Sequence, residues 1–396
     1  MKKIYVLFLM FIFLSSISLA GTVNLPQTGQ TKCYDTAGTE ILCAGTGQDG
    51  EIQAGVEWPS PRFTVNGDCV TDNLTGLMWA RNGNLAKLPK NWNDAIDYCN
   101  SLTLCGYDDW HLPNVNELES LYNANEPEPY TWLNSQGFIN VLSQYYWTST
   151  AVANRTDIKW WVYMYYGLAN VTNQITVSSH LFIWPVRSGE GMSAPAPVWK
   201  TGQTTSYRTG DDGDLEKGVA WPNPRFTDNG DTVTDNLTGL MWTKNANLPN
   251  GPTDWQVALD YVKGMNNGTH ENLGYTDWRL PNCKELHSLN DFSTNIPALP
   301  SGNPFTNVQN DGYWSSSSWP RATGAALGVY MDPGILINLG KDVDIYHYYV
   351  WPVRGGQVLN ASCFNWADVI GKYNSYVSGQ AVWNNVIECY NQYVSP

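Results

Sequence analysis

The chain has 396 residues, and its 36 acidic and 22 basic side chains give a net charge of −14. An acidic surface repels phosphate backbones, so we expect no nucleic-acid partner, and it disfavours anionic membrane surfaces and polysulfated chains. Only 15% of the residues are charged. Asn, Thr, Ser, Gly, Tyr and Trp are abundant, which favours a neutral polar partner such as a glycan.

The first twenty residues resemble a cleaved secretory signal. Lys2 and Lys3 precede an apolar run over residues 4–17, and the Ser-Leu-Ala at 18–20 resembles a small-residue cleavage site. The run is too short for a membrane span, and no later run of eighteen apolar residues occurs. We therefore expect a signal peptide over residues 1–20 and a mature protein that is secreted, periplasmic or on the cell surface, with no membrane span.

The rest of the chain contains the same unit twice. The string WPSPRFTVNGDCVTDNLTGLMW at 58–79 returns as WPNPRFTDNGDTVTDNLTGLMW at 221–242, and three later motifs return at a nearly constant offset. Units of this length are too long to be solenoid repeats, so we expect each to bury its own core. We predict one domain over residues 21–189, a linker over 190–197 and a second domain over 198–357.

Each copy opens with a predicted β-hairpin. Apolar and β-branched residues flank the turn sequence DNGD, which lies at 228–231 in the second copy. The carboxylates of this turn also resemble a calcium-binding loop, but Val65 replaces Asp228 in the first copy and the closing Glu of an EF-hand is missing. We expect no metal site and no cofactor, with calcium as the alternative that this turn leaves open.

Two helices and a sheet follow the hairpin. The first helix is predicted at 91–99 and again at 254–265, where apolar side chains recur at i, i+3, i+4 and i+7. The second begins at Asn114 and Asn282, which can form capping boxes with the glutamates three residues later, so those glutamates have a structural role. A mostly antiparallel sheet is expected in the remainder of each copy. The predicted fold class is therefore α+β.

Twelve of the nineteen tryptophans form six matched pairs between the copies. Positions that both copies keep need no ligand to explain them, and large aromatic side chains dominate core burial. We therefore predict that the matched tryptophans fill the cores and that recognition lies where the copies differ. The pairs are Trp58/Trp221, Trp79/Trp242, Trp92/Trp255, Trp110/Trp278, Trp147/Trp314 and Trp184/Trp351.

The copies diverge most at 151–161 and 318–328, within the expected sheet. Variable loops on a fixed sheet are a common way to present a binding surface. Sugars offer apolar faces to aromatic rings and hydroxyls to polar side chains, so aromatic, Arg and Asp residues in and near these segments are the predicted ligand contacts. These residues are Arg155, Trp160, Trp161, Tyr165, Trp319, Arg321, Asp332 and Tyr346.

The sequence lacks the motifs of common catalytic sites, because no G-x-S-x-G, H-E-x-x-H or phosphate-binding loop is present. Only one pair of histidines matches between the copies, His180 and His347, and we expect it to be packed and hydrogen-bonded. Arg187 and Arg354 are expected to close ion pairs with a carboxylate such as Asp109 or Asp277. We predict no catalytic residue and no enzyme activity.

Eight cysteines in a secreted chain indicate disulfides. Cys33 and Cys43 are both absent from the second copy, as bonded partners should be. Cys99 and Cys105 are also both replaced there, in their case by apolar residues. We therefore predict the pairs Cys33–Cys43 and Cys99–Cys105.

The remaining four cysteines divide between the tail and the copies. Residues 358–396 belong to neither copy and contain a small helical repeat, so we predict a helical tail stapled by a disulfide between Cys363 and Cys389. Cys69 and Cys283 each stand alone in their copy. We expect two buried free thiols there, with a bridge between the domains as the alternative.

The ordered motifs DNGDTVTDNLTGLMW, GYTDWRLPNCKEL, YWSSS and VWPVRGG occur in related form in both copies, and they resemble the family of the Legionella collagen-like adhesin C-terminal domain. The resemblance implies two tandem domains with a C-type lectin-like fold. It also implies adhesion, since the adhesin that names the family binds sulfated glycans. The chain departs from that pattern, because it has no collagen-like segment and no calcium-and-sugar triplets of true lectins, and its first copy has His111 where the second has Arg279.

These observations predict a secreted bacterial glycan-binding or adhesin-like protein with two lectin-like domains and no catalysis. The alternative is an extracellular structural or interaction protein that assembles with other proteins through its domains and tail. The expected partner is an extracellular glycan or a surface protein. The oligomeric state does not follow from the sequence.

Overall fold

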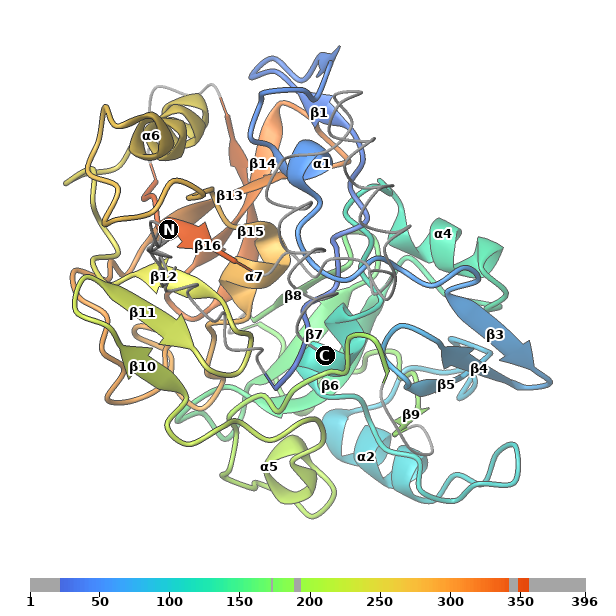
Figure 1. Ribbon diagram of the computed structural model, residues 1–396. Coiled ribbons are helices and arrows are strands. Elements are labelled where there is room, and N and C mark those ends of the chain that lie inside the picture. Colours follow the sequence, from blue (N-terminus) through green and yellow to red (C-terminus); the bar gives the residue numbers. More distant parts are fainter. Residues whose placement is uncertain (1–21, 172–173, 189–193, 342–347, 356–396) are drawn as a thin grey trace, which may run out of the picture.

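The computed structural model describes residues 22–171, 174–188, 194–341 and 348–355. Two similar α+β units lie side by side in this part of the chain (Figure 1). Each contains one four-stranded and one three-stranded sheet, and the named strands in these sheets pair antiparallel. The predicted α+β class and the tandem organisation are therefore confirmed. The predicted tail at 358–396, with Cys363 and Cys389, lies outside the described residues.

The first copy has a four-stranded sheet in the order β3-β4-β5-β9 and a three-stranded sheet in the order β6-β7-β8. Its last strand returns beside β5, so the beginning and the end of the copy meet in one sheet. The strands are β3 (Phe63–Asn66), β4 (Cys69–Asp72), β5 (Met78–Ala80), β6 (Tyr145–Ala151), β7 (Lys159–Tyr163), β8 (Leu168–Asn170) and β9 (Val186–Arg187). The helices are α2 (Trp92–Asn100), α3 (Val115–Glu119) and α4 (Pro129–Ser135).

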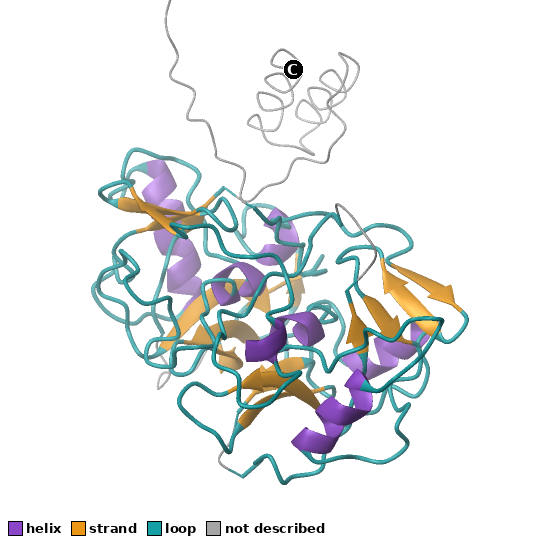
Figure 2. Cartoon of the chain, turned by 90° about the horizontal axis from the view of Figure 1, so that it is seen from below, coloured by secondary structure: helices purple, strands orange, loops and turns teal. Residues whose placement is uncertain are grey.

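The second copy repeats this plan with sheets in the orders β10-β11-β12-β16 and β13-β14-β15. Figure 2 shows short helices and strands connected by long loops in both units. The strands are β10 (Phe226–Asp228), β11 (Thr232–Asp235), β12 (Met241–Thr243), β13 (Gly312–Ser318), β14 (Ala325–Tyr330), β15 (Ile335–Gly340) and β16 (Val353–Arg354). The helices are α6 (Trp255–Asn267) and α7 (Cys283–His287).

The hairpins and both helix pairs form where the sequence predicts them. Capping boxes are complete at Asn114 and Glu117 and at their counterparts in the second copy. Each boxed glutamate also contacts a basic side chain six residues earlier, His111 in the first copy (3.0 Å) and Arg279 in the second (2.6 Å). The exchange of His for Arg therefore keeps the same buried interaction, and the structural role of these glutamates is confirmed.

The matched tryptophans are core residues, as predicted, except for one pair. All of them are buried apart from Trp58 and Trp221, which are half-buried. Each indole of this pair lies 4.2 Å from a guanidinium, that of Arg62 or Arg225. Each also donates its N–H at 2.8 Å to a backbone carbonyl. Both copies therefore have the same half-buried tryptophan with the same two kinds of contact, which indicates a structural role for this pair.

Segments before each copy form two arms that cross to the other copy. The first arm, residues 22–57, carries β1 (Cys33–Tyr34), β2 (Glu40–Ile41) and α1 (Asp49–Ile52), and the second arm, residues 198–220, carries α5 (Asp212–Leu215). Figure 1 shows α1 beside β13 and β14 of the second copy, and α5 near α2 and β6 of the first. The exchange is reciprocal, so the two copies are related approximately as the subunits of a symmetric dimer.

Side-chain amides fasten both arms at matched positions. Gln30 of the first arm accepts from the Ser318 N–H (2.8 Å) and donates to the Ser318 carbonyl (2.9 Å) at the end of β13. Gln203 of the second arm donates to the carbonyl of Ala151 (3.1 Å) at the end of β6, the position that matches Ser318. Each arm thus completes the edge of a sheet in the opposite copy.

The cores are also partly shared. Leu25, Tyr122, Ala124 and Leu168 belong to a cluster whose other buried members come from the second copy. Two further clusters lie wholly within one copy, around Trp92 in the first and around Trp255 in the second, so each copy buries a core of its own as expected, and the shared cluster adds contacts across the junction. The sequence boundaries at 189 and 198 stay predictions, and packing continues across them.

The disulfides confirm one predicted pair and correct another. Cys33 and Cys43 are bonded within the first arm. Cys105 is bonded to Cys69 rather than to Cys99. Cys99 is a buried free thiol because it lies on the inner face of α2, among the core side chains, and Cys283 is a buried free thiol as predicted. Cys69 is therefore not a free thiol, and no bridge joins the copies within the described residues.

The predicted ion pairs are confirmed, whereas the histidine prediction is wrong. Arg187 pairs with Asp109 and Arg354 with Asp277, both at 2.6 Å. His180 is exposed: it lies just before the isolated bridges at Leu181 and Phe182, and Trp184 follows these bridges outside any strand. Its matched partner at position 347 lies outside the described residues.

Candidate binding site at the junction of the two copies

Two of the predicted ligand contacts are core residues. Trp160 and Trp161 lie in β7, the central strand of its sheet, and are only 2% and 6% exposed. The ring of Trp160 packs edge-on against Phe292 of the second copy, with ring centres 5.0 Å apart, and Trp161 belongs to the cluster around Trp92. Rings buried this deeply have no surface to offer a ligand, so the prediction that these two tryptophans bind one is wrong.

Three other predicted residues lie apart from one another in what the structure describes. Arg155 is on the surface and pairs with Asp157 at 3.0 Å, between β6 and β7. Asp332 is half-buried in the turn that follows β14. Tyr346 lies outside the described residues. The ligand contacts of these three residues stay predictions.

The structure brings the remaining three predicted residues together, from both copies. The guanidinium of Arg321 lies 3.7 Å from the ring centre of Tyr165. Arg321 also donates to the carbonyls of Pro127 (3.0 Å) and Tyr165 (3.4 Å). Trp319 packs edge-on against Tyr166, with ring centres 5.7 Å apart. Tyr165 and Tyr166 of the first copy and Trp319 and Arg321 of the second therefore form one surface that neither copy has alone.

A row of aromatic rings extends this surface along the first copy. We call it the aromatic ladder: its members are Tyr145, Tyr163, Tyr165, Tyr166 and Trp319. Tyr145 stacks on Tyr163 with ring centres 4.3 Å apart, and Tyr163 contacts Tyr166 at 5.1 Å. Tyr145 and Tyr166 are 37% and 36% exposed. The second copy has no such row, because Gly312, Asp332 and Pro333 replace three of the tyrosines.

A cavity of about 440 Å³ lies beside the aromatic ladder, at Arg321. We call it the Arg321 cavity. Its lining comes mostly from α4 and the turn before it: Glu126, Pro127, Glu128, Thr131, Trp132, Ser135 and Arg321. Pro129 at the first turn and the buried Leu133 favour the helix and fix it against the core. The second copy has no counterpart of α4 in its described part, so this cavity is not repeated.

Trp132 forms an aromatic wall of the Arg321 cavity and is held in place from behind. Its ring packs edge-on against Phe63, with ring centres 5.8 Å apart, and at a tilt against Trp58, with ring centres 5.9 Å apart. The Thr131 hydroxyl donates to Glu128 at 3.1 Å. The sequence analysis did not select Trp132, Glu126 or Glu128 as ligand contacts. The segment around α4 has no match in the second copy, so the difference between the copies could have pointed to these residues.

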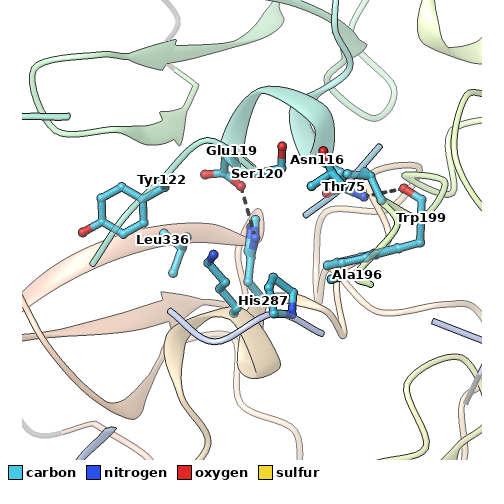
Figure 3. A pocket seen from close by; sticks show the side chains of 12 residues that line it. Thr75, Asn116, Glu119, Ser120, Tyr122, Ala196, Trp199, His287 and Leu336 are labelled. Carbon is cyan, nitrogen blue, oxygen red and sulfur yellow. Dashed lines mark hydrogen bonds and ion pairs between the residues drawn. The ribbon is translucent and has the colours of Figure 1, made fainter. Parts of the chain in front are cut away.

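A second, smaller cavity lies inside the junction and encloses about 50 Å³, room for a few water molecules at most. Figure 3 shows Glu119 of α3 and His287 of α7 meeting across it, 3.2 Å apart. These two residues occupy matched positions, the last residue of each short helix. At a two-fold axis, a residue contacts the equivalent residue of the other unit. Glu119 and His287 are such equivalent residues, so they lie close to the approximate two-fold axis that relates the two copies.

Burial shifts the titration of groups in the junction. Desolvation raises the pKa of Glu119, and it lowers the pKa of Lys284, which also lines the small cavity, to about 7. His287 completes the cluster with a hydrogen bond to the carbonyl of Gly334 at 3.1 Å. These contacts fasten the copies to each other. The cavity is too small for a sugar, so we assign it a structural role.

The arms carry a buried carboxylate each. Asp212 of the second arm accepts from the hydroxyls of Thr150 and Thr201, both at 2.7 Å, and Asp49 of the first arm accepts from Thr28 (2.7 Å) and Ser317 (2.5 Å). Desolvation raises the pKa of Asp212 to about 7 and that of Asp49 to about 6, although the hydroxyl donors oppose the shift.

The raised pKa of Asp212 makes arm docking dependent on pH. The folded pKa exceeds the unfolded value, so the stabilising contribution is complete below pH about 4 and is lost as the pH rises through about 7. Between pH 5 and pH 8, ionisation of Asp212 should lower the free energy of unfolding by roughly 2 kcal/mol. We expect Asp212→Asn to reduce the fall in unfolding free energy between these pH values by that amount.

Denaturant titrations at pH 5 and pH 8 measure this difference. Asp214→Asn is the control, because Asp214 lies in the same helix and is exposed. It should leave the pH trend unchanged. An Asp212→Asn variant with the pH dependence of the parent would show that this carboxyl does not titrate as described.

The fold and the site define a protein of two tandem α+β copies, joined by exchanged arms, with a ring-lined surface at their junction. The model of the Lcl C-terminal domain family matches residues 68–187 and 231–354, which together exceed half of the chain. The chain therefore belongs to the Lcl C-terminal domain family, in two copies. Both matches begin after the arms. No curated protein matches the chain.

Family membership makes the chain an adhesin-like extracellular protein. Two disulfides agree with an oxidising compartment. In the described ranges, no helix has the length and apolar character needed to cross a membrane. Nor do three or more His, Cys, Asp or Glu residues of that same part of the chain come together as a metal site would require.

Proposed function

We propose that the protein binds glycans through the aromatic ladder and the Arg321 cavity, as an adhesin-like protein without catalytic activity. The observation that carries the proposal is the exposed row of rings beside a cavity that both copies complete. Tyrosine rings offer apolar faces for sugar C–H groups, and the cavity supplies hydroxyl, carboxylate and guanidinium partners for sugar hydroxyls.

The position of this surface supports recognition rather than packing. Most of the matched tryptophans are buried and serve packing, whereas the aromatic ladder is partly exposed and occurs once in the described part of the chain. The rings also hold one another in place, so little side-chain entropy is lost when a ligand binds. A pre-organised surface of this kind suits weak attachment that is strengthened by multivalent display.

An extracellular protein that assembles with other proteins is the second candidate. Tyr, Trp and Arg are the residues most enriched in protein interfaces, so the aromatic ladder also suits a protein partner. Binding to glycans that is absent from every member of a broad array, together with self-association of the chain, would favour this candidate.

A glycan array probed with the whole chain tests the proposed function. We expect binding to a subset of glycans and at least a tenfold loss in Tyr163→Ala, because Tyr163 contacts three other rings of the ladder. Tyr330→Ala is the matched control, since Tyr330 occupies the same strand position in the second copy without the ladder. It should bind as the parent does.

The same experiment addresses catalysis. Labelled glycans that bind should be recovered intact after prolonged incubation with the chain. A shortened product that disappears in Glu128→Gln would contradict the non-catalytic part of the proposal. Equal losses in Tyr163→Ala and Tyr330→Ala would contradict the assignment of the ladder as the site.

A further inference from the structure

Within the proposed glycan-binding function, on which this inference rests, we propose that the Arg321 cavity takes an uncharged sugar unit and rejects sulfated or carboxylated ones. Its volume of about 440 Å³ lies in the range of small-molecule sites, roughly 300–1,000 Å³. Its lining combines one indole, two carboxylates, two hydroxyls and one guanidinium. This set can stack a sugar ring and pair with several of its hydroxyls.

Among the described residues that line the cavity, the Arg321 guanidinium is the only cationic group, and it already forms contacts within the protein. Its Nη1 donates to the carbonyls of Pro127 and Tyr165, and its Cζ lies 3.7 Å from the centre of the Tyr165 ring. Recognition of a sulfate or carboxylate favours a two-pronged approach by a free guanidinium. Because Nη1 already donates to both carbonyls, an anion could reach this guanidinium only from its Nε and Nη2 side, while the guanidinium stays stacked on Tyr165.

The two carboxylates make the net charge of the cavity lining negative. Glu126 and Glu128 outnumber Arg321, and neither forms an ion pair with a basic side chain in the described ranges. An anionic substituent would enter a negative cavity on a chain with a net charge of −14. Repulsion of like charges is strong where solvent is partly excluded. A sugar hydroxyl, in contrast, can donate to either carboxylate and gains from the charge of its acceptor.

Trp132 supplies the apolar contact that an uncharged sugar needs. Its ring forms one wall of the cavity and is backed by Phe63 and Trp58, so it does not have to be ordered by the ligand. The Thr131 and Ser135 hydroxyls lie on the same helix, one residue before and three residues after this ring. Both hydroxyls already donate within the protein, Thr131 to Glu128 (3.1 Å) and Ser135 to the Trp132 carbonyl (2.6 Å), so their oxygens would accept from the hydroxyls of a sugar stacked on Trp132.

The cavity also fixes the stoichiometry. At the positions that match Trp319 and Arg321, the first copy has Val152 and Asn154, and the second copy has no counterpart of α4 in its described part. The described part of the chain therefore does not repeat this cavity in the second copy, although the fold is repeated. Strong attachment to a surface would need display of several chains.

The test uses the whole chain and an array of neutral, sialylated and sulfated glycans, followed by isothermal titration of the best neutral glycan and of its 6-sulfated form. We expect one site per chain and at least tenfold weaker binding of the sulfated form. Trp132→Ala should weaken binding of the neutral form at least tenfold.

Charge variants separate the cavity from the chain as a whole. The double variant Glu126→Gln/Glu128→Gln should reduce the discrimination against the sulfated form at least threefold. The control Glu57→Gln/Glu271→Gln removes the same two charges at exposed positions outside the cavity and should leave the discrimination unchanged.

The outcomes distinguish this inference from the function on which it rests. Equal or tighter binding of the sulfated form by the parent chain overturns the inference and leaves glycan binding intact. The same effect from both double variants also overturns it, because long-range charge would then decide specificity. Absence of binding to every glycan on the array overturns the proposed function and the inference together.

Discussion

Gln30→Ala in the first arm is expected to loosen the second copy, whereas Gln203→Ala in the second arm should loosen the first. Gln30 is 3% exposed and satisfies both the N–H and the carbonyl of Ser318 at the end of β13. Its removal takes a partner from these two groups and from the carbonyl of Ala124 in the first copy (3.1 Å), at a cost of about 2–4 kcal/mol. Gln203 makes the matching contact with Ala151 at the end of β6.

Hydrogen–deuterium exchange measures this prediction separately for each copy. In Gln30→Ala, amides at the end of β13 should exchange at least tenfold faster while those of β6 keep the rate of the parent. Gln203→Ala should give the reverse pattern with a smaller effect, because Gln203 makes one contact across the junction rather than two. Faster exchange confined to the copy that follows the mutated arm in sequence would show that the arms fold back and are not exchanged.

Exchanged arms also explain why the whole chain is the right unit for experiments. A copy that is separated from its partner loses the arm that completes its sheet and part of its core. It would expose edge groups and apolar side chains, which favour aggregation or swapping between chains. Loss of binding in an isolated copy would therefore say nothing about the residues of the site.

Local patterns predicted most of the fold, and distant contacts escaped prediction. The hairpin turn, the helical spacing around Trp92 and the capping box at Asn114 each depend on residues close in sequence, and all three form as predicted. The contact of Gln30 with Ser318 spans 288 residues. Nothing in a repeated sequence distinguishes an arm that folds onto its own copy from one that crosses to the other, because both copies offer nearly the same surface.

The candidate site was predicted in part, for a similar reason. Divergence between the copies selected Tyr165, Trp319 and Arg321, and the structure brings these three residues together, while their ligand contacts stay a prediction. Trp160 and Trp161 met the same criterion but lie in a central strand, where both faces are covered. Residue type and divergence select candidates, whereas position in the sheet decides which of them reach the surface.

The disulfide pattern shows how one criterion failed. Cys69, Cys99 and Cys105 face Thr232, Val262 and Leu273 in the second copy, so all three are lost together and joint loss fits any pairing among them. The structure selects Cys69 and Cys105, which are 36 residues apart, because α2 turns Cys99 into the core. Closing a loop of this size stabilises a protein by about 3–4 kcal/mol through the entropy of the unfolded chain.

Cys69→Ser and Cys105→Ser are therefore each expected to lower the free energy of unfolding by about 3–4 kcal/mol, and the double variant should lose no more than either alone, because all three variants remove the same bond. Cys99→Ala removes one buried sulfur and should cost roughly 1 kcal/mol. Denaturant titration without reductant measures these differences, and peptide mapping should recover a linked Cys69–Cys105 fragment. If Cys99→Ala is as damaging as Cys105→Ser and a Cys99-linked fragment appears, the pairing predicted from joint loss is correct and α2 does not present its inner face as described.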